Sequence, residues 1–356
     1  MTKHFNSRYA RVETFRRHRR RPDFDNLLKV FRREAPPQPT LFEFAMNPDI
    51  YNALTAEIAY DANDPLRREK QMVDAFRLAG YDFVAMSGSP FHFPIPRPDK
   101  GSKSSVSLNT GAPISDRGSF ERYAWPNPDD CDYSVLEKIV PYLPDGMKVI
   151  VYDPYGVLET VIDLVGYETL CFMVLEDPDF AQELFDQVGE RLRRYHELCA
   201  SFPSVGAHFL GDDWGFNQQT TLSPEHMRRY VLPWHKKAVQ TIHAAGKPAI
   251  LHSCGNLAAV MDDIIDDLSY DAKHSFEDKI QPVEAAWQQY GGRIALLGGI
   301  DVDFLCRATP EAVYARSAAM LEKTNGHAYA LGSGNSIPEY VPMESYFAMN
   351  AAAVFE

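Results

Sequence analysis

Cysteine is scarce in the chain and follows no regular spacing. The 356 residues contain five cysteines, an odd number, and no two of them form a CxxC pair. This argues against a disulfide framework of the kind that holds small secreted domains together. No apolar run approaches the ~18 residues of a membrane span, and the N-terminal segment lacks the apolar core of a secretory signal. We therefore expect a cytoplasmic protein with reduced thiols.

Positive charge is also in short supply over most of the chain. Lys and Arg total 36 against 49 Asp and Glu, a formal net charge of -13. The exception is residues 1–36, which hold 11 Lys and Arg against 4 Asp and Glu. A basic run such as residues 16–21 can bind nucleic acid, but beside so acidic a body we favour an arm that lies on the body or on a neighbouring subunit. We expect no nucleic-acid or membrane partner, and we leave a homodimer open.

Eight short, mostly apolar segments alternate with segments of helical pattern. A doubly wound open sheet would show the same alternation, but no GxGxxG fingerprint follows a strand. The pattern therefore predicts an α/β fold of the (β/α)8 (TIM) barrel type. The eight candidate strands are residues 40–44, 81–86, 147–153, 205–211, 247–255, 270–277, 293–301 and 327–335.

The length fits one large domain with additions, because about 250 residues is typical of such a barrel. We expect a basic N-terminal arm and helix over residues 1–39 and the barrel over residues 40–356. Residues 88–144, after the second strand, are rich in Pro, Gly and aromatic residues without a sustained period. Long loops of this kind are often functional, so we predict a lid-like insertion there.

Polar side chains follow nearly every candidate strand. In a (β/α)8 barrel the C-terminal ends of all strands meet at one face, where catalytic groups lie. The predicted fold thus gathers a set of strand-end residues into one pocket: Glu43, Ser87, Asp153, Asp212, Asp213, His252, Cys254, Glu277, Asp301 and Asn335.

The segment Lys247–Gly255, with the sequence KPAILHSCG, places an imidazole and a thiol at the end of one strand. Two residues apart on a strand, His252 and Cys254 point to the same face and offer nitrogen and sulfur, two donors that zinc accepts. The alternative is two buried residues with no shared task, because two ligands do not make a site.

Three carboxylates are candidates for catalysis. Asp212 and Asp213 are adjacent and face opposite ways on a strand, so at most one enters the pocket while the other caps a helix or pairs with a basic residue. We predict a substrate-binding or proton-handling role for one of them. Glu43 lies between aromatic residues and is a candidate general acid or metal neighbour, with an internal ion pair as the alternative.

Four motifs characterise the C-terminal part: GDDWGFNQQT from Gly211, KPAILHSCGN from Lys247, LLGGIDVDF from Leu296 and ALGSGNSIPEYVP from Ala330. Over residues 205–345 the chain resembles the uroporphyrinogen decarboxylase superfamily. It is most similar to the branch of cobamide-dependent methyltransferases, which includes methylcobalamin:coenzyme M methyltransferases and the methyltransferase components of demethylation systems. The resemblance also implies a (β/α)8 barrel.

In the methyltransferase branch, a His-x-Cys pair after the fifth strand and a second Cys after the eighth bind zinc, which activates a thiol acceptor. His252 and Cys254 match the pair, whereas Ser333 stands where the second Cys is expected. Glu277 is our candidate for the third ligand, since zinc also accepts carboxylate oxygen. The alternative is a pocket that binds its substrate without a metal.

The resemblance implies a methyltransferase that moves a methyl group between a small methylated substrate and a cobamide carried by a corrinoid protein. Zinc would act as a Lewis acid, and Glu43 with Asp212 or Asp213 would handle the proton. His274 could instead be a core residue, and Asp301 could instead cap the turn that follows it. The candidates for substrate binding are Asp153, Trp214, His274, Asp301, Ser333 and Asn335.

Two other functions remain open. One is a metal-free lyase of the decarboxylase type acting on an acidic ring compound, although the chain lacks the arginine-bearing RQAGR-type motif of that branch. The other is a non-catalytic barrel that binds a small molecule, which the missing second cysteine would favour.

Overall fold

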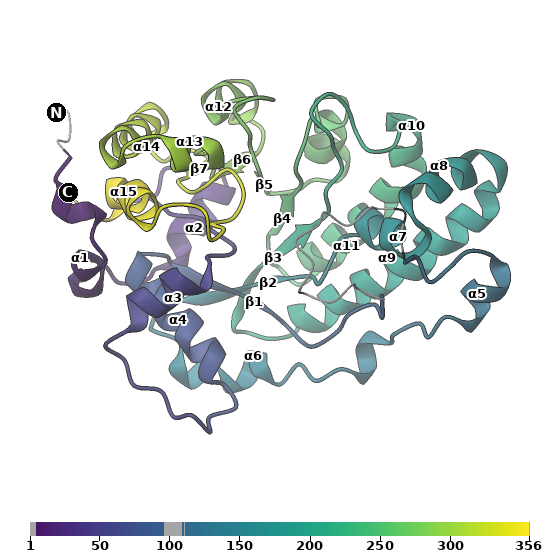
Figure 1. Cartoon of the computed structure of the whole chain (residues 1–356), viewed down its shortest axis with the longest axis horizontal. Helices are drawn as coiled ribbons and strands as arrows, with labels where there is room; N and C mark the ends of the chain where they lie inside the picture. The colour runs from purple at the N-terminus through teal and green to yellow at the C-terminus, as the bar shows by residue number, and fades with distance from the viewer. Residues whose placement is uncertain (1–4, 96–108, 110, 356) are drawn as a thin grey trace.

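The fold is α/β, with a curled parallel sheet flanked by helices. The computed structural model describes residues 5–95, 109 and 111–355. Within them, seven strands pair in chain order, each parallel to the next (Figure 1). The strands are β1 Phe83–Ser87, β2 Lys148–Tyr152, β3 Val205–Gly211, β4 Ala249–His252, β5 Ala272–His274, β6 Ala295–Leu297 and β7 Tyr329–Ala330.

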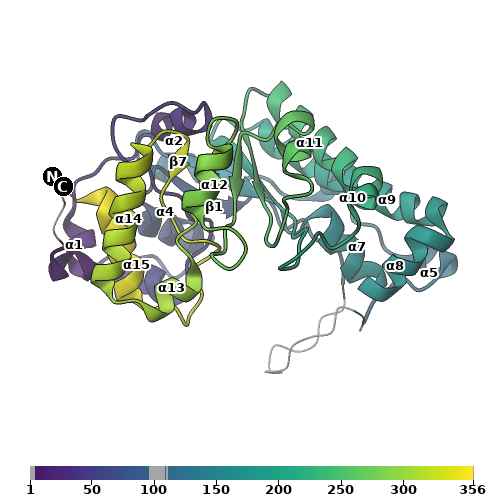
Figure 2. The ribbon, with the colours of Figure 1, turned by 90° about the horizontal axis from the view of Figure 1, so that it is seen from above.

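Helices connect successive strands, as parallel pairing requires. Figures 1 and 2 agree that α1 and α13–α15 lie at one end of the molecule and α7–α10 at the other. No helix of the described chain is long and apolar enough to cross a membrane. The helices are α1 Val12–Arg17, α2 Phe24–Phe31, α3 Pro48–Thr55, α4 Arg67–Ala79, α5 Arg117–Arg122, α6 Val135–Lys138, α7 Val157–Val165, α8 Tyr167–Glu176, α9 Pro178–Ala200, α10 Pro224–His226, α11 Leu232–Ala244, α12 Val283–Tyr290, α13 Val302–Arg307, α14 Pro310–Thr324 and α15 Met343–Val354.

The first predicted strand, residues 40–44, is not formed as a strand. The segment makes an isolated parallel bridge between Leu41 and Leu331, and the Phe42 N–H donates to the Leu331 carbonyl. On its other side, the ring of Phe42 lies 5.4 Å from that of Phe83 in β1. Prolines immediately before the segment remove backbone donors, which shortens any ladder. The eight-stranded barrel is thus confirmed only in part, as a curled sheet of seven strands.

The inner face of the sheet is lined by rings near the C-terminal ends of the strands. Phe209 of β3 lies 4.9 Å from Phe44 and 5.3 Å from His252 of β4, between ring centroids. His252 in turn lies 5.0 Å from His274 of β5. Because side chains alternate along a strand, residues next to these rings, such as Lys273, start from the opposite face.

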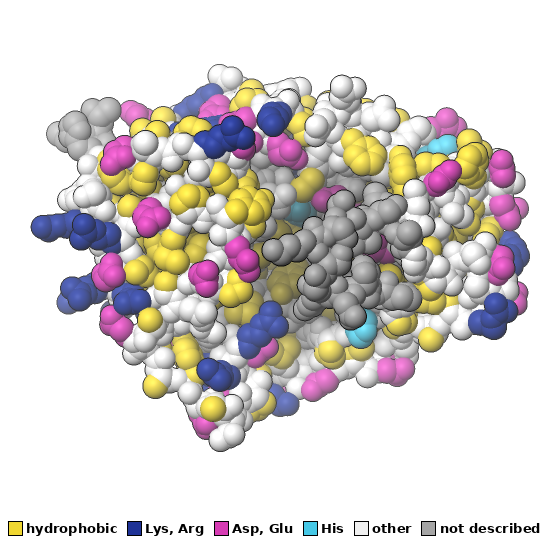
Figure 3. All heavy atoms as spheres, in the orientation of Figure 1, with side chains coloured by type: hydrophobic (Ala, Val, Ile, Leu, Met, Phe, Trp, Pro, Cys, Tyr) yellow, Lys and Arg dark blue, Asp and Glu magenta, His cyan; other side chains and the backbone are white. Residues whose placement is uncertain are grey.

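The described part of the basic arm packs on the body of the protein. Phe15 of α1 is fully buried, and the Arg16 guanidinium donates to the Ala53 carbonyl of α3. Arg20 lies 3.3 Å from the buried Asp82 carboxylate. Asp and Glu side chains are spread among hydrophobic ones over the face in Figure 3, rather than gathered in one patch.

In its described residues the predicted lid, 88–144, has short helical turns between irregular segments. Its stretch 96–108 and residue 110 lie outside the described residues, as do residues 1–4 of the predicted arm. The described remainder packs against α9, where Arg194 lies 2.5 Å from Asp129 and Arg191 donates to the Pro126 carbonyl.

Candidate metal centre

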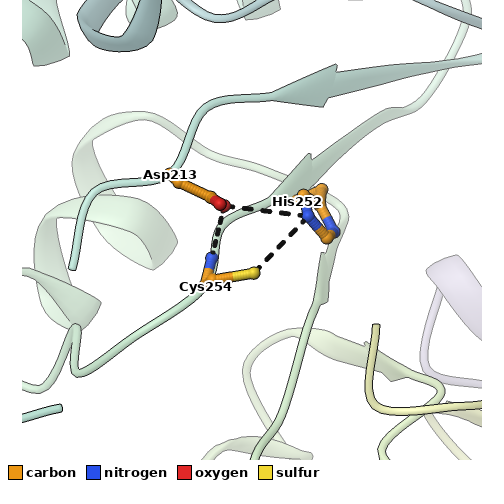
Figure 4. A group of neighbouring side chains, drawn as sticks. All are labelled: Asp213, His252 and Cys254. Carbon is orange, nitrogen blue, oxygen red and sulfur yellow. Dashed lines mark hydrogen bonds and ion pairs between the residues drawn. The ribbon is translucent and has the colours of Figure 1, made fainter. Parts of the chain in front are cut away.

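Three side chains from two neighbouring strand ends come together in the structure. His252 ends β4, Cys254 follows two residues later, and Asp213 follows β3 (Figure 4). The register pairs Gly211 of β3 with His252, so the loops after the two strands start side by side. The three ligand atoms lie within 4.8 Å of one another, and these residues could hold one metal ion.

The distances within the group are short and mutually consistent. Nε2 of His252 lies 3.7 Å from Oδ1 of Asp213 and 3.7 Å from Sγ of Cys254. The Cys254 N–H donates to Oδ1 of Asp213 at 2.8 Å, which holds the two loops in register (Figure 4). A nitrogen, a sulfur and an oxygen thus converge on one point from fixed backbone positions.

The second ring nitrogen of His252 is bound by another imidazole. Its Nδ1 lies 2.8 Å from Nδ1 of His274, and Nε2 of His274 lies 3.4 Å from the Ser333 carbonyl. A carbonyl only accepts, so His274 carries its proton on Nε2 and accepts at Nδ1. His252 is therefore the donor at Nδ1, which leaves its Nε2 lone pair free to face Asp213 and Cys254.

The protonation states follow from burial. Desolvation lowers the pKa of His252 to about 4, although the negative charge of Asp213 opposes this shift. The imidazole is therefore neutral at pH 7. Desolvation, followed by the negative charge of Asp213, raises the pKa of the Cys254 thiol to about 12. The sulfur accepts a hydrogen bond from Nδ2 of Asn335 at 3.2 Å, which favours a thiolate once a cation is present.

The two adjacent aspartates have different partners. Asp212 is fully buried, accepts the backbone N–H groups of Leu158 and Glu159 at the start of α7, and lies 2.9 Å from Nε2 of His235. Its carboxylate is therefore committed to anchoring α7 and α11. Asp213 alone of the pair joins the metal-binding group.

The structure does not bring Glu277 into this group: the carboxylate beside His252 and Cys254 belongs to Asp213. Glu277 instead lines two cavities that also touch Cys254, one of about 560 Å³ bordered by Phe216 and one of about 390 Å³ bordered by Asn335. Its position suits contact with a ligand in these cavities.

Two other predicted binding residues use their carboxylates elsewhere, and a third is buried. Asp153 accepts the Gly211 N–H and lies 3.3 Å from His196 on α9. Asp301 caps α13 by accepting the Phe304 N–H, although it also lines the smaller cavity. Trp214 is fully buried, with its ring edge-on to His235.

Glu43 lies inside the fold, behind Ser333. The Ser333 N–H lies 3.4 Å from Oε2 of Glu43, and both side chains are fully buried. Burial raises the pKa of the Glu43 carboxyl to about 8, the hydrogen bonds from Ser333 opposing the rise, so the group is protonated at neutral pH. Ser333 thus links Glu43 through its N–H and His274 through its carbonyl.

Two residues near the centre have a role that sequence analysis missed. Lys273 is a buried lysine on β5, and its only sequence signal was a charge inside a strand of otherwise buried pattern. Glu159 of α7 has a pKa raised to about 8 by burial and then by Asp212 and Asp213, so it holds a proton close to the group. The position of Asp213 beside His252 could have been predicted, since β3 and β4 are neighbours in a barrel.

Comparison with known proteins identifies a family and solved structures of similar fold. The sequence pattern described as uroporphyrinogen decarboxylase (URO-D) matches residues 155–354, more than half of the chain. A methyltransferase from Methanosarcina mazei superposes with a TM-score of 0.70 at 18% identity, covering 92% of this chain and 97% of that chain. At this identity the likeness establishes the fold alone.

More distant structures add nothing further. An intracellular xylanase from Thermoanaerobacterium saccharolyticum reaches a TM-score of 0.43 at 11% identity, over 87% of this chain and 95% of that chain. This likeness is too weak to bear on function. Comparison with curated proteins gives no significant match.

Proposed function

Because the chain belongs to the uroporphyrinogen decarboxylase (URO-D) family, we propose that it is a zinc-assisted methyltransferase of a corrinoid-dependent demethylation system. It moves a methyl group between a small methylated substrate and a cobamide carried by a second protein. The observation that carries the proposal is the convergence of Asp213, His252 and Cys254 at the ends of β3 and β4.

The donor set fits zinc. Zinc takes thiolate sulfur, imidazole nitrogen and carboxylate oxygen at about 2.0–2.3 Å, so tetrahedral ligand atoms lie about 3.5 Å apart. The two ligand separations of 3.7 Å at His252 agree with this spacing. Three protein ligands also leave the fourth position open, as in catalytic zinc sites. Asp213 supplies the donor that the serine at position 333 does not.

When bound, zinc supplies Lewis acidity to the heteroatom from which the methyl group leaves or to which it is added. The surrounding residues prepare the site for that role. His274 holds His252 in the tautomer whose Nε2 is free, and Asn335 donates to the Cys254 sulfur. Burial and the negative charges of Asp212 and Asp213 keep Glu159 protonated at neutral pH, so it is a proton donor close to the group.

The cavities next to Cys254 favour a small substrate. Their volumes, about 390 and 560 Å³, fall in the range of sites for small molecules. Among the described residues that line them, Lys279 is the one cation, against Glu277, Asp301 and Asp303. A lyase for an acidic ring compound needs several cations to hold carboxylates, so this lining favours methyl transfer.

The test uses purified chain loaded with zinc and cob(I)alamin as the stand-in for the partner's cobamide. Methyl ethers, methylamines and methyl thioethers are supplied in turn, and methylation is followed by loss of the cob(I)alamin absorbance. We expect turnover with one donor class and none with Cys254→Ala. No methylation of cob(I)alamin with any donor contradicts the proposal, and metal-free decarboxylation of an acidic ring compound would establish the lyase instead.

A further inference from the structure

Lys273 is a buried lysine at the centre of the strand-end loops. It lies between Ala272 and His274 on β5, and only 4% of its surface is exposed. Its side chain starts from the face opposite His274, so it does not enter the ring-lined interior. Burying an ammonium is costly, and a Met or Leu would fill the same space. The charge therefore calls for a specific role.

The Lys273 ammonium connects the loop after β4, which carries Cys254, with the loop after β5. Its Nζ donates to the carbonyl of Ser253, at 3.3 Å, and to the carbonyl of Ser275. It also lies 4.3 Å from the centroid of the Phe276 ring, where a cation is attracted to the ring face. No ion pair of Lys273 occurs in the described chain, so its hydrogen bonds go to backbone rather than to a carboxylate.

One carbonyl belongs to a residue between two candidate ligands, and the other to the residue after His274, which contacts His252. Ser253 lies between His252 and Cys254, and its N–H donates to the His274 carbonyl at 2.9 Å. Ser275 follows His274, and its Oγ lies 3.7 Å from Sγ of Cys254. One ammonium thus fixes the backbone on both sides of the thiol.

The charge of Lys273 also complements the group that it holds. Desolvation lowers the pKa of Lys273 to about 8, while Cys254, Asp213 and Glu277 act to raise it, so the side chain is mainly protonated at pH 7. A thiolate and a carboxylate next to each other repel, and a fixed cation behind them reduces that repulsion.

We propose that Lys273 is a positioning residue: its ammonium clamps the loops after β4 and β5 so that His252 and Cys254 keep the spacing of a single metal site with Asp213, to which the Cys254 N–H donates. This inference rests on the proposed metal-binding function. It assigns to Lys273 no contact with substrate or metal.

The experiment compares two variants. Lys273→Met keeps the side-chain length but removes the hydrogen-bond donors and the charge, whereas Lys273→Arg keeps the donors and the charge. Lys247→Met is the matched control, because Lys247 also donates to a carbonyl, that of Phe202, but lies before β4 rather than after it. Zinc affinity is measured by competition with a chelator, and cobalt substitution reports the thiolate-to-metal absorption band. Hydrogen exchange of the metal-free chains reports loop opening around residues 253–256 and 275–277.

We expect Lys273→Met to weaken zinc binding about 10- to 100-fold, as loss of outer groups around metal ligands does, and to reduce the cobalt–thiolate band. Exchange in the two loops should be faster, whereas Lys273→Arg restores most of each value and Lys247→Met changes none of them. Equal zinc affinity and equal loop exchange in Lys273→Met and Lys247→Met overturn the proposal.

Two further outcomes are distinguishable. If Lys273→Met does not fold, Lys273→Gln against Lys273→Arg decides the same question, because Gln keeps a donor without the charge. If the wild-type chain binds neither zinc nor cobalt, the metal function fails, and loop exchange in the variants still decides whether Lys273 clamps the loops.

Discussion

Nδ1 of His252 lies 2.8 Å from Nδ1 of His274, so the two imidazoles share one proton between them. Desolvation lowers the pKa of both rings, that of His252 to about 4, and both are therefore neutral at pH 7. With Nε2 of His274 committed to the Ser333 carbonyl, the shared proton belongs to His252. The relationship fixes the tautomer in which His252 can bind a metal.

His274→Phe tests this orientation. Phenylalanine keeps the ring packing against Phe42 and Phe44 but has no acceptor for the Nδ1 proton of His252. We expect zinc affinity, measured by chelator competition, to fall about 10- to 100-fold. His226→Phe, on α10 away from the centre, is the control and should bind zinc as the wild type does. Equal affinity in the two variants would show that His274 does not orient the ligand.

The adjacent aspartates should separate stability from metal binding. Asp212→Asn weakens the contact with His235 and leaves one of the two N–H groups of α7 without a full partner, so we expect the free energy of unfolding to fall by about 3 kcal/mol. Its folded fraction should still bind zinc. Asp213→Asn should lower zinc binding and leave the free energy of unfolding nearly unchanged. The Asp213 side chain is 43% exposed, and it belongs to the candidate metal-binding group. Denaturant unfolding and metal content measure the two effects.

Glu43 predicts a pH dependence of stability. Its pKa of about 8 in the folded chain exceeds the ordinary value of 4.5, so the folded state holds the proton more tightly than the unfolded state. The stabilisation is complete below about pH 4.5 and is lost as pH rises towards 8, by up to about 1.4 kcal/mol for each pH unit. Glu43→Gln mimics the protonated form and should remove this slope in urea unfolding between pH 5 and 8. A slope unchanged in the variant would contradict the assignment.

Zinc affinity should itself depend on pH. The Cys254 thiol, with a pKa raised to about 12, must lose a proton to bind, whereas His252 is already neutral above about pH 5. One proton is released for each ion bound, so the apparent dissociation constant should fall about tenfold per unit between pH 6 and 9. Chelator competition across this range measures it, and a flat profile would show that Cys254 is not a ligand.

Much of the fold could be predicted from the sequence. Seven of the eight predicted strands form, because parallel strands buried on both faces have continuous apolar runs such as Ala249–Leu251. The failure at residues 40–44 has a local cause: a proline-rich lead-in and a partner on one side only. The local hydrophobic pattern of a segment does not show how many hydrogen bonds it makes with a neighbouring strand.

The site was harder to predict than the fold. His252 and Cys254 could be paired because, on the predicted strand, their spacing gives them a common face. In the structure β4 ends at His252, and Cys254 lies just after it. The choice between Asp213 and Glu277 depended on how two loops bend after their strands, which is set by contacts such as that between the Cys254 N–H and Asp213. The clamp by Lys273 depends on backbone carbonyls, which every residue has and no sequence pattern reveals.

Metal content of the purified chain, by elemental analysis, tests the central claim most directly. The account predicts about one zinc per chain in the wild type and in Glu277→Gln, and little or none in His252→Ala, Cys254→Ala and Asp213→Asn. Absence of metal from wild-type protein prepared with added zinc would contradict it. So would loss of zinc from Glu277→Gln together with its retention in Asp213→Asn, since Glu277 rather than Asp213 would then be the ligand.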